Sequence, residues 1–154
     1  MMSDENNMPP LVINGQYVKD LSFEVPGAPG IYGEMAGQNP EIPIHVDINA
    51  AAIADKTYEV TLHLKVEAHL AENKPVFIAE LAYAGIFTLN VPDEHIQPML
   101  LIECPRLLFP FARSIIADMT RDGAFPPLMI QPIDFMQLYR SRMEAAQGQE
   151  AGHA

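Results

Sequence analysis

An unbroken alternation of apolar and polar side chains from Thr57 to Leu70 constrains the fold of this chain more than any other feature. Because successive side chains of a strand point to opposite faces, the pattern predicts a strand with one buried and one solvated face. At roughly 3.3 Å per residue this strand would be about 46 Å long. A compact monomer of 154 residues has a diameter of only about 40 Å. So long a strand favours a broad sheet that subunits share.

Three further segments carry strand patterns. Residues 11–25 predict a first strand with a bulge at Gly15. Residues 42–48 alternate, and Pro43 indicates a strand start or a sheet edge, because proline cannot donate to a ladder. Residues 76–89 are apolar on both faces, which indicates either cover on both sides or an exposed docking surface. The first half of the chain therefore predicts a sheet of four strands.

The segments between these strands carry turn residues. Residues 26–40 are rich in glycine and proline and predict a long loop, a kind of segment that is often functional. Residues 50–56 are expected to be a connector, and residues 72–74 the turn of a hairpin.

The second half of the chain has helical spacing. Residues 90–94 carry start signals for a helix that could run to Glu103, and Pro105 is expected to break or kink that helix. A longer helix is expected over residues 107–119, with Pro110 near its first turn and Gly123 at its C-terminal stop.

The remaining segments complete an α+β chain. Residues 124–133 contain three prolines and predict an extended loop, after which Asp134 can cap a last helix. We expect a flexible N-terminal arm over residues 1–9, a single domain over 10–146 and a disordered tail over 147–154. The predicted fold is a four-stranded antiparallel sheet packed on a long helix, plus a C-terminal helix.

Charge and cysteine content restrict the location and partners. The net charge of −11 argues against nucleic acid and against an anionic membrane surface. A single cysteine, Cys104, cannot form an intramolecular disulfide and fits a reducing compartment. Residues 1–7 lack the regions of a signal peptide, and no run approaches the length of a membrane span. We therefore expect a cytoplasmic protein without direct membrane insertion.

No catalytic motif is present in the sequence, so we expect no enzyme and no cofactor. Cys104 lies among leucines, which favours a buried, unreactive thiol. His63 and His69 are about 20 Å apart along one strand face and cannot bind one metal ion. His45 or Glu67 could meet one of them across strands, but solvated sheet residues are the favoured interpretation. No metal site is predicted.

Several longer motifs resemble the SecB family of protein-export chaperones. They occur in order over about residues 10–145 and comprise YVKDLSFEVPGAP at 17–29, YEV at 58–60, GIF at 85–87, CPRLLFPFAR at 104–113, GAFPPL at 123–128 and PIDF at 132–135. The resemblance implies the fold predicted above, assembled as a dimer of dimers. In that homotetramer the helices lie between two eight-stranded sheets. The side chains implied to pack sheet against helix, or subunit against subunit, are Phe77, Ala79, Leu81, Tyr83, Leu108, Phe111, Ile115 and Met119.

The resemblance also implies two binding surfaces. Four positions match the family's docking surface for the translocation motor SecA, which brings a basic, zinc-bound C-terminal segment: Asp20, Glu24, Ile78 and Glu80. An ordinary solvated sheet face is the alternative. Unfolded clients are bound in apolar grooves bordered by two loops, which here contain Ile31, Tyr32, Met35, Phe125, Leu128, Met129 and Ile130. The alternative for each of these residues is a core or subunit contact.

Two features depart from many relatives. Relatives often carry a tryptophan in the first loop, whereas this chain has none, and the tail over residues 147–154 is less acidic than in some of them.

The implied function is that of an ATP-independent holdase. Such a protein keeps precursors unfolded and export-competent and delivers them to SecA. The alternatives are a related chaperone that serves a toxin–antitoxin pair, an enzyme with a site at a subunit interface and a small-ligand adaptor with a closed pocket.

Overall fold

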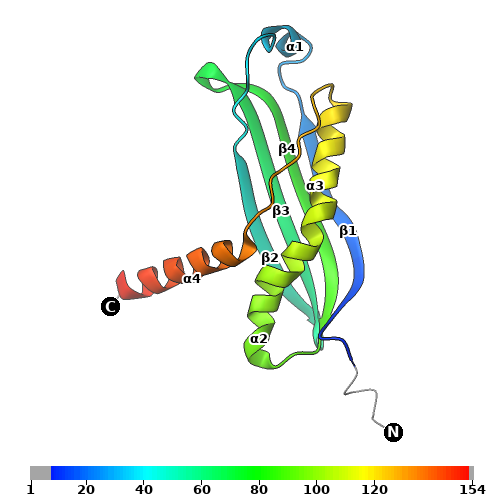
Figure 1. Cartoon of the computed structure of the whole chain (residues 1–154), viewed down its shortest axis with the longest axis vertical. Helices are drawn as coiled ribbons and strands as arrows, with labels where there is room; N and C mark the ends of the chain where they lie inside the picture. Colours follow the sequence, from blue (N-terminus) through cyan, green and yellow to red (C-terminus); the bar gives the residue numbers. More distant parts are fainter. Residues whose placement is uncertain (1–7, 153–154) are drawn as a thin grey trace.

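A curved antiparallel sheet with the strand order β1-β4-β3-β2 forms one layer, and α2 and α3 lie across one of its faces (Figure 1). The computed structural model describes residues 8–152. Its elements are β1 (Leu11–Glu24), α1 (Gly30–Glu34), β2 (Ile44–Ala54), β3 (Thr57–Leu70), a 3-10 turn η2 (Ala71–Asn73), β4 (Lys74–Leu89), α2 (Asp93–Pro98), a π-helical turn η3 (Met99–Glu103), α3 (Cys104–Asp122) and α4 (Phe135–Gly152). The predicted fold class is confirmed.

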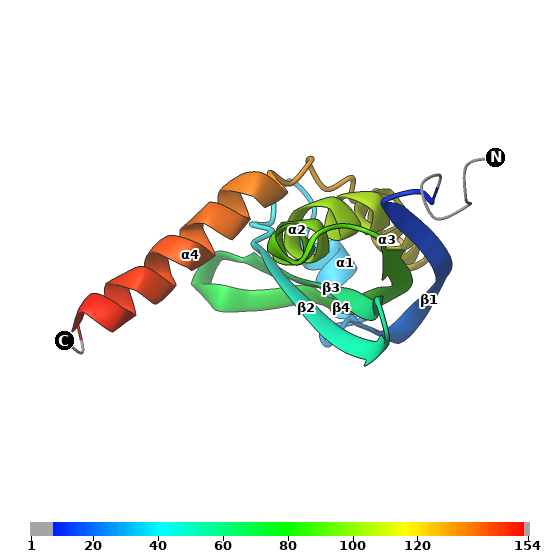
Figure 2. The same cartoon turned by 90° about the horizontal axis from the view of Figure 1, so that it is seen from below.

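The end-on view separates the two faces of the sheet (Figure 2). The face that carries α3 is called the inner face, and the opposite face, which no helix of residues 8–152 covers, is called the outer face. On the inner face Leu64 of β3 pairs with Leu81 of β4 and with Val46 of β2. Leu64 and Leu81 are almost fully buried. At Gly85 an added Cβ would lie 3.0 Å from Leu108 of α3, so sheet and helix approach closely there.

Strand β3 has the bounds that the alternation predicted, but β2 is longer than expected. It begins directly after Pro43, at the sheet edge, and continues to Ala54, so the predicted connector over 50–56 is wrong. Alanines have low intrinsic strand preference, and the segment is held in the sheet by pairing with β3. The actual turn is confined to residues 55–56, with Lys56 at a φ of 56°.

The loop predicted over residues 26–40 contains a short helix, α1. Its residue Ile31 is 1% exposed, and the Ile31 amide donates to the carbonyl of Gly27. This buried side chain holds one helical turn that local composition did not indicate.

Pro105 does not break the helix, so of the two expected outcomes, a break or a kink, the break is wrong. The chain stays helical from α2 through η3 into α3. The π-helical turn that ends two residues before Pro105 shifts the hydrogen-bond pattern, which accommodates a residue without an N–H group. Pro110 lies in the interior of α3 and not in its first turn. Burial of Leu108, Ala112 and Ile116 against the sheet stabilises the helix around it.

Helix α3 ends at Asp122 with Gly123 as its C-cap, which is the predicted stop, but the residue with positive φ is Ala124, at 68°. The Phe125 amide donates to the carbonyl of Thr120, and the Ala124 amide donates to that of Arg121, which is the Schellman pattern.

Helix α4 projects away from the sheet (Figures 1 and 2). The predicted cap is confirmed, because the Gln137 amide donates to Oδ1 of Asp134 over 3.0 Å. The helix continues to Gly152, although a disordered tail was predicted from residue 147. Residues 1–7 of the predicted arm and 153–154 of the predicted tail lie outside the described residues. Within residues 8–152, none of the helices has the length and apolar character needed to span a membrane.

Candidate functional site

The outer face brings the four predicted docking residues together. In the β1–β4 ladder Asp20 lies opposite Ala82, and Glu24 lies opposite Ile78. Glu80 lies two residues from Ile78 on the same face of β4. Asp20, Glu24 and Glu80 are exposed, and Ile78 is partly buried. The face therefore places one apolar side chain among carboxylates.

A shallow hollow of about 550 Å³ lies on this face and extends to the opposite edge of the sheet. Its lining residues are Lys19, Asp20, His45, Val46, Asp47, Asn49, His63, Leu64, Lys65, Glu80, Leu81 and Ala82. The hollow thus includes Asp20 and Glu80, whereas Glu24 and Ile78 lie beside it.

Lys65 neutralises part of the outer face. Its Nζ lies 3.0 Å from Oε1 of Glu67 and 3.4 Å from Oε1 of Glu80. The hydrogen bond to Glu67 is the main cause that raises the pKa of Lys65, and the same bond lowers the pKa of Glu67. Among the described residues, Asp20 and Glu24 form no ion pair. These two carboxylates remain available to a cationic ligand.

A second polar group on the outer face joins β1 to β3. Lys19 Nζ donates to Oε1 of Glu59 over 2.8 Å, and the Tyr17 hydroxyl donates to the other carboxylate oxygen of Glu59. These bonds lower the pKa of Glu59, the one from Lys19 most. The hydrogen bond to Glu59 is the main cause that raises the pKa of Tyr17 to about 12. The sequence did not predict this group, because its members are distant in the chain. A second bulge of β1, at Lys19, also has no glycine or proline that would have indicated it.

The histidines of the sheet do not assemble a metal centre. His63 Nε2 lies 3.0 Å from Nδ2 of Asn49, and His69 Nε2 lies 3.1 Å from Oε2 of Glu41. In the described part of the chain, no three His, Cys, Asp or Glu side chains converge as metal ligands. The arrangement offers charge and hydrogen bonds to a ligand.

Cys104 is fully buried. Burial, and to a smaller extent Glu103, raises the pKa of its thiol to about 12. The thiol is therefore protonated at neutral pH, and a protonated thiol is a poor nucleophile.

A cluster of aromatic side chains joins the two loops predicted to border the client grooves. Phe125 lies 5.1 Å from Phe77 and 5.3 Å from Tyr32, measured between ring centroids, and Phe23 lies 5.6 Å from Phe77. The Tyr32 hydroxyl donates to the carbonyl of Gly123 over 2.7 Å. These four aromatic residues, called the aromatic cluster, connect α1 to the loop after α3.

The structure divides the predicted client-binding residues. Tyr32 and Met129 are exposed, at 38% and 55%. Met35 and Leu128 are partly buried. The side chains of Ile31, Phe125 and Ile130 lie in the core. In a single chain, the accessible surface of these residues therefore comes mainly from Tyr32 and Met129, with a smaller share from Met35 and Leu128.

Most of the predicted packing residues lie between sheet and helix. The buried ones are Phe77, Ala79, Leu81, Tyr83 and Leu108, whereas Ile115 and Met119 are partly buried. Phe111 stacks on Tyr83 at 6.2 Å, yet it is 51% exposed.

Phe111 belongs to a larger uncovered surface. Val18, which pairs with Tyr83, and Leu21, which pairs with Leu81, lie on the inner face of edge strand β1 and stay exposed. The exposed apolar residues of β1 and α3 are called the apolar strip: Ile13, Val18, Leu21, Leu107 and Phe111. The sequence indicated their apolar character but not their exposure in a single chain.

Comparison with known proteins gives consistent results. The family model for SecB, described as preprotein translocase subunit SecB, matches residues 4–146. The protein-export protein SecB of Paramagnetospirillum magneticum is 64% identical over 146 residues, which cover 93% of this chain and 94% of the relative. The protein-export protein SecB of Rhodospirillum rubrum is 57% identical over 155 residues, which cover 97% of this chain and 96% of the relative.

Among solved structures, a similar fold occurs in a SecB-like chaperone of Mycobacterium tuberculosis, which was solved with a peptide from an antitoxin. The TM-score is 0.68 at 16% sequence identity, over 80% of this chain and 91% of that chain. This likeness concerns the fold alone.

Proposed function

This chain belongs to the SecB family of preprotein translocase subunits, and on that premise we propose that it is an ATP-independent export chaperone. It holds precursor proteins unfolded and export-competent and delivers them to SecA. The observation that carries this proposal is the 64% and 57% identity to relatives named protein-export protein SecB, over 93% and 97% of this chain.

Clients bind at the end of the sheet where α1 meets the loop after α3. Tyr32 and Met129 are exposed beside the aromatic cluster, and Met35 and Leu128 are partly accessible. Flexible methionine and aromatic side chains repack against different partners, which suits binding without sequence preference. Binding then depends on whether a client exposes apolar segments, and folded proteins expose few of them.

Delivery uses the outer face. The free carboxylates of Asp20 and Glu24 and the partly exposed Ile78 complement a basic segment that also carries apolar side chains. SecA contributes its basic, zinc-bound C-terminal segment. Reversing both charges, in Asp20→Lys with Glu24→Lys, should abolish binding of that segment while client binding persists; unchanged segment binding would contradict this assignment.

The working form is a homotetramer. β1 is an edge strand whose unpaired backbone groups can pair with β1 of a second copy, and the apolar strip lies beside that edge. Such pairing extends each sheet and buries the strip, which supports a symmetric dimer and then a dimer of dimers.

Refolding kinetics test the holdase function. A slow-folding precursor is diluted from denaturant with and without the protein, in the absence of nucleotide. We expect its refolding to be delayed in proportion to the protein added, and a precursor that has already folded to be unaffected. Refolding at the same rate with and without an excess of the protein would overturn the proposal.

A further inference from the structure

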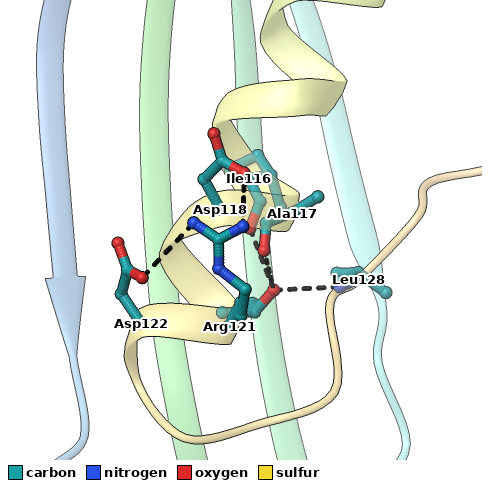
Figure 3. A network of polar contacts seen from close by, with 7 residues as sticks. Ile116, Ala117, Asp118, Arg121, Asp122 and Leu128 are labelled. Carbon is teal, nitrogen blue, oxygen red and sulfur yellow. Dashed lines mark hydrogen bonds and ion pairs between the residues drawn. The ribbon is translucent and has the colours of Figure 1, made fainter.

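The last turn of α3 contains a buried hydroxyl with a partner outside its own helix (Figure 3). Thr120 is fully buried, and its Oγ1 lies 3.0 Å from the carbonyl oxygens of both Ile116 and Ala117, to which it donates its single proton. The same oxygen accepts a hydrogen bond from the Leu128 amide over 2.9 Å. Donation to a preceding carbonyl is common for helical threonines, whereas the bond from Leu128 reaches across eight residues of chain.

This bond matters because the loop has few other donors. Pro126 and Pro127 have no N–H group. The amides that remain between Gly123 and Met129 belong to Ala124, Phe125 and Leu128, and each bonds to the last turn of α3. Thr120 receives two of these bonds, Phe125 through its backbone carbonyl and Leu128 through its side chain. Thr120 thus bonds to both ends of the segment from Phe125 to Leu128, which is called the proline arch.

The position of the arch decides which side chains face solvent. Phe125, at one end, enters the aromatic cluster. Beyond the other end Met129 is 55% exposed, whereas Ile130 is 4% exposed. A shift of the chain by one residue at Leu128 would exchange these two environments. The Leu128–Thr120 bond therefore sets the register of the segment that borders the client surface.

We propose that Thr120 is a positioning residue for client binding: its buried hydroxyl holds the loop after α3 in the register that exposes Met129 and keeps Ile130 in the core. This inference rests on the proposed chaperone function. Thr120 is buried, so no client contacts its side chain. The positioning role belongs to its hydroxyl group and not to the β-branched shape of the side chain.

Two substitutions separate these contributions. Thr120→Val keeps the shape but removes the acceptor, and Thr120→Ser keeps the hydroxyl. Asp122→Asn is a matched control on the same turn, because it alters only an exposed ion pair with Arg121 and leaves the arch untouched. Each full-length variant is compared with wild type by amide hydrogen exchange and by titration with a precursor held unfolded.

In Thr120→Val we expect the Leu128 amide to exchange at least about tenfold faster, because it loses its shielded acceptor. Amides of β3 should keep their wild-type protection. The affinity for the unfolded precursor should fall about threefold to tenfold, because the loop must then be ordered on binding. Thr120→Ser should restore both values, and Asp122→Asn should match wild type.

Wild-type affinity in Thr120→Val, with Leu128 exchanging faster, would overturn the inference while leaving the chaperone function intact. Failure of Thr120→Ser to restore affinity would overturn it as well. If wild type does not bind the unfolded precursor, that result would instead contradict the proposed function. If the valine variant does not fold, Thr120→Cys, whose thiol is only a weak acceptor, provides the same comparison with serine.

Discussion

At the residue scale, a side-chain contact decides the position of one glycine. Gly123 has an ordinary φ of −87°, while Ala124 takes the left-handed conformation. A Cβ at Gly123 would lie 2.6 Å from Cε1 of Phe23, in the aromatic cluster. The helix stop was therefore predicted at the correct residue for an incomplete reason, since tertiary packing, and not backbone freedom, requires glycine there.

Gly123→Ala should lower the free energy of unfolding by about 1–3 kcal/mol, because the methyl group overpacks the aromatic cluster. Gly148→Ala is the matched control, since an added Cβ there meets nothing within 4 Å inside α4. The control should be neutral or stabilising by up to about 1 kcal/mol. Urea unfolding of both variants checks the prediction, and equal stabilities would contradict it.

The buried thiol predicts a dependence of stability on alkaline pH. Burial raises the pKa of Cys104 from 9.0 to about 12. Below pH 9 the thiol is neutral in both states, so its contribution to stability is fully present. Between pH 9 and 12 only the unfolded state ionises, so the contribution is lost as pH rises.

Cys104→Val should therefore lose less stability than wild type between pH 8 and pH 10.5, measured by urea unfolding in a reducing buffer. Tyr17, whose pKa is raised from 10.0 to about 12, adds a change of the same sign to both proteins and cancels in the comparison. Parallel pH profiles for the two proteins would show that Cys104 does not contribute.

At the scale of elements, the sequence predicts the bounds of those segments whose structure is determined by local residue patterns. The alternation over β3 fixes its bounds and its buried face, and Asp134 marks the start of α4. Pairing and packing decide the rest. The alanines of β2 form a strand because β3 lies beside them, and the helix continues past Pro105 because η3 accommodates it.

The candidate functional surfaces follow the same division. The outer-face positions alternate with the core positions of β4, so they could be predicted once the strand was recognised. The bridge from Tyr17 to Glu59 and the bond from Leu128 to Thr120 join residues that share no periodic pattern. These contacts required the fold itself.

Helix α4 provides a prediction at this scale. Arg142 Nη2 lies 2.5 Å from Oδ1 of Asp47, and its Nη1 donates to the Ile48 carbonyl over 3.3 Å, which ties α4 to edge strand β2. Arg142→Gln should speed amide exchange along α4. It should change global stability by less than about 1 kcal/mol, because the ion pair is exposed.

Arg140→Gln is the control, since Arg140 is exposed on the same helix and forms no ion pair among the described residues. Equal exchange in the two variants would show that the contact with β2 does not hold α4.

At the scale of the whole molecule, the apolar strip is the surface through which we expect the subunits to associate. Val18→Lys places a charge on the inner face of edge strand β1, beside Tyr83 and Phe111. We expect wild type to sediment as a tetramer and this variant as smaller species, because burying an unpaired charge at an interface is costly.

Ile53→Lys is the control, since Ile53 is 55% exposed at the far edge of the sheet, outside the strip. A tetramer of unchanged stability in Val18→Lys would place the subunit interface elsewhere.

We propose that clients bind on the loops beside the aromatic cluster and that a partner docks on the outer face of the sheet. Calorimetric titration without nucleotide shows whether binding depends on the unfolded state of the client. The protein is titrated with a slow-folding precursor held unfolded and, separately, with the same precursor folded. We expect saturable binding of the unfolded chain alone, whereas equal binding of both forms, or of neither, would rule out the proposed holdase function.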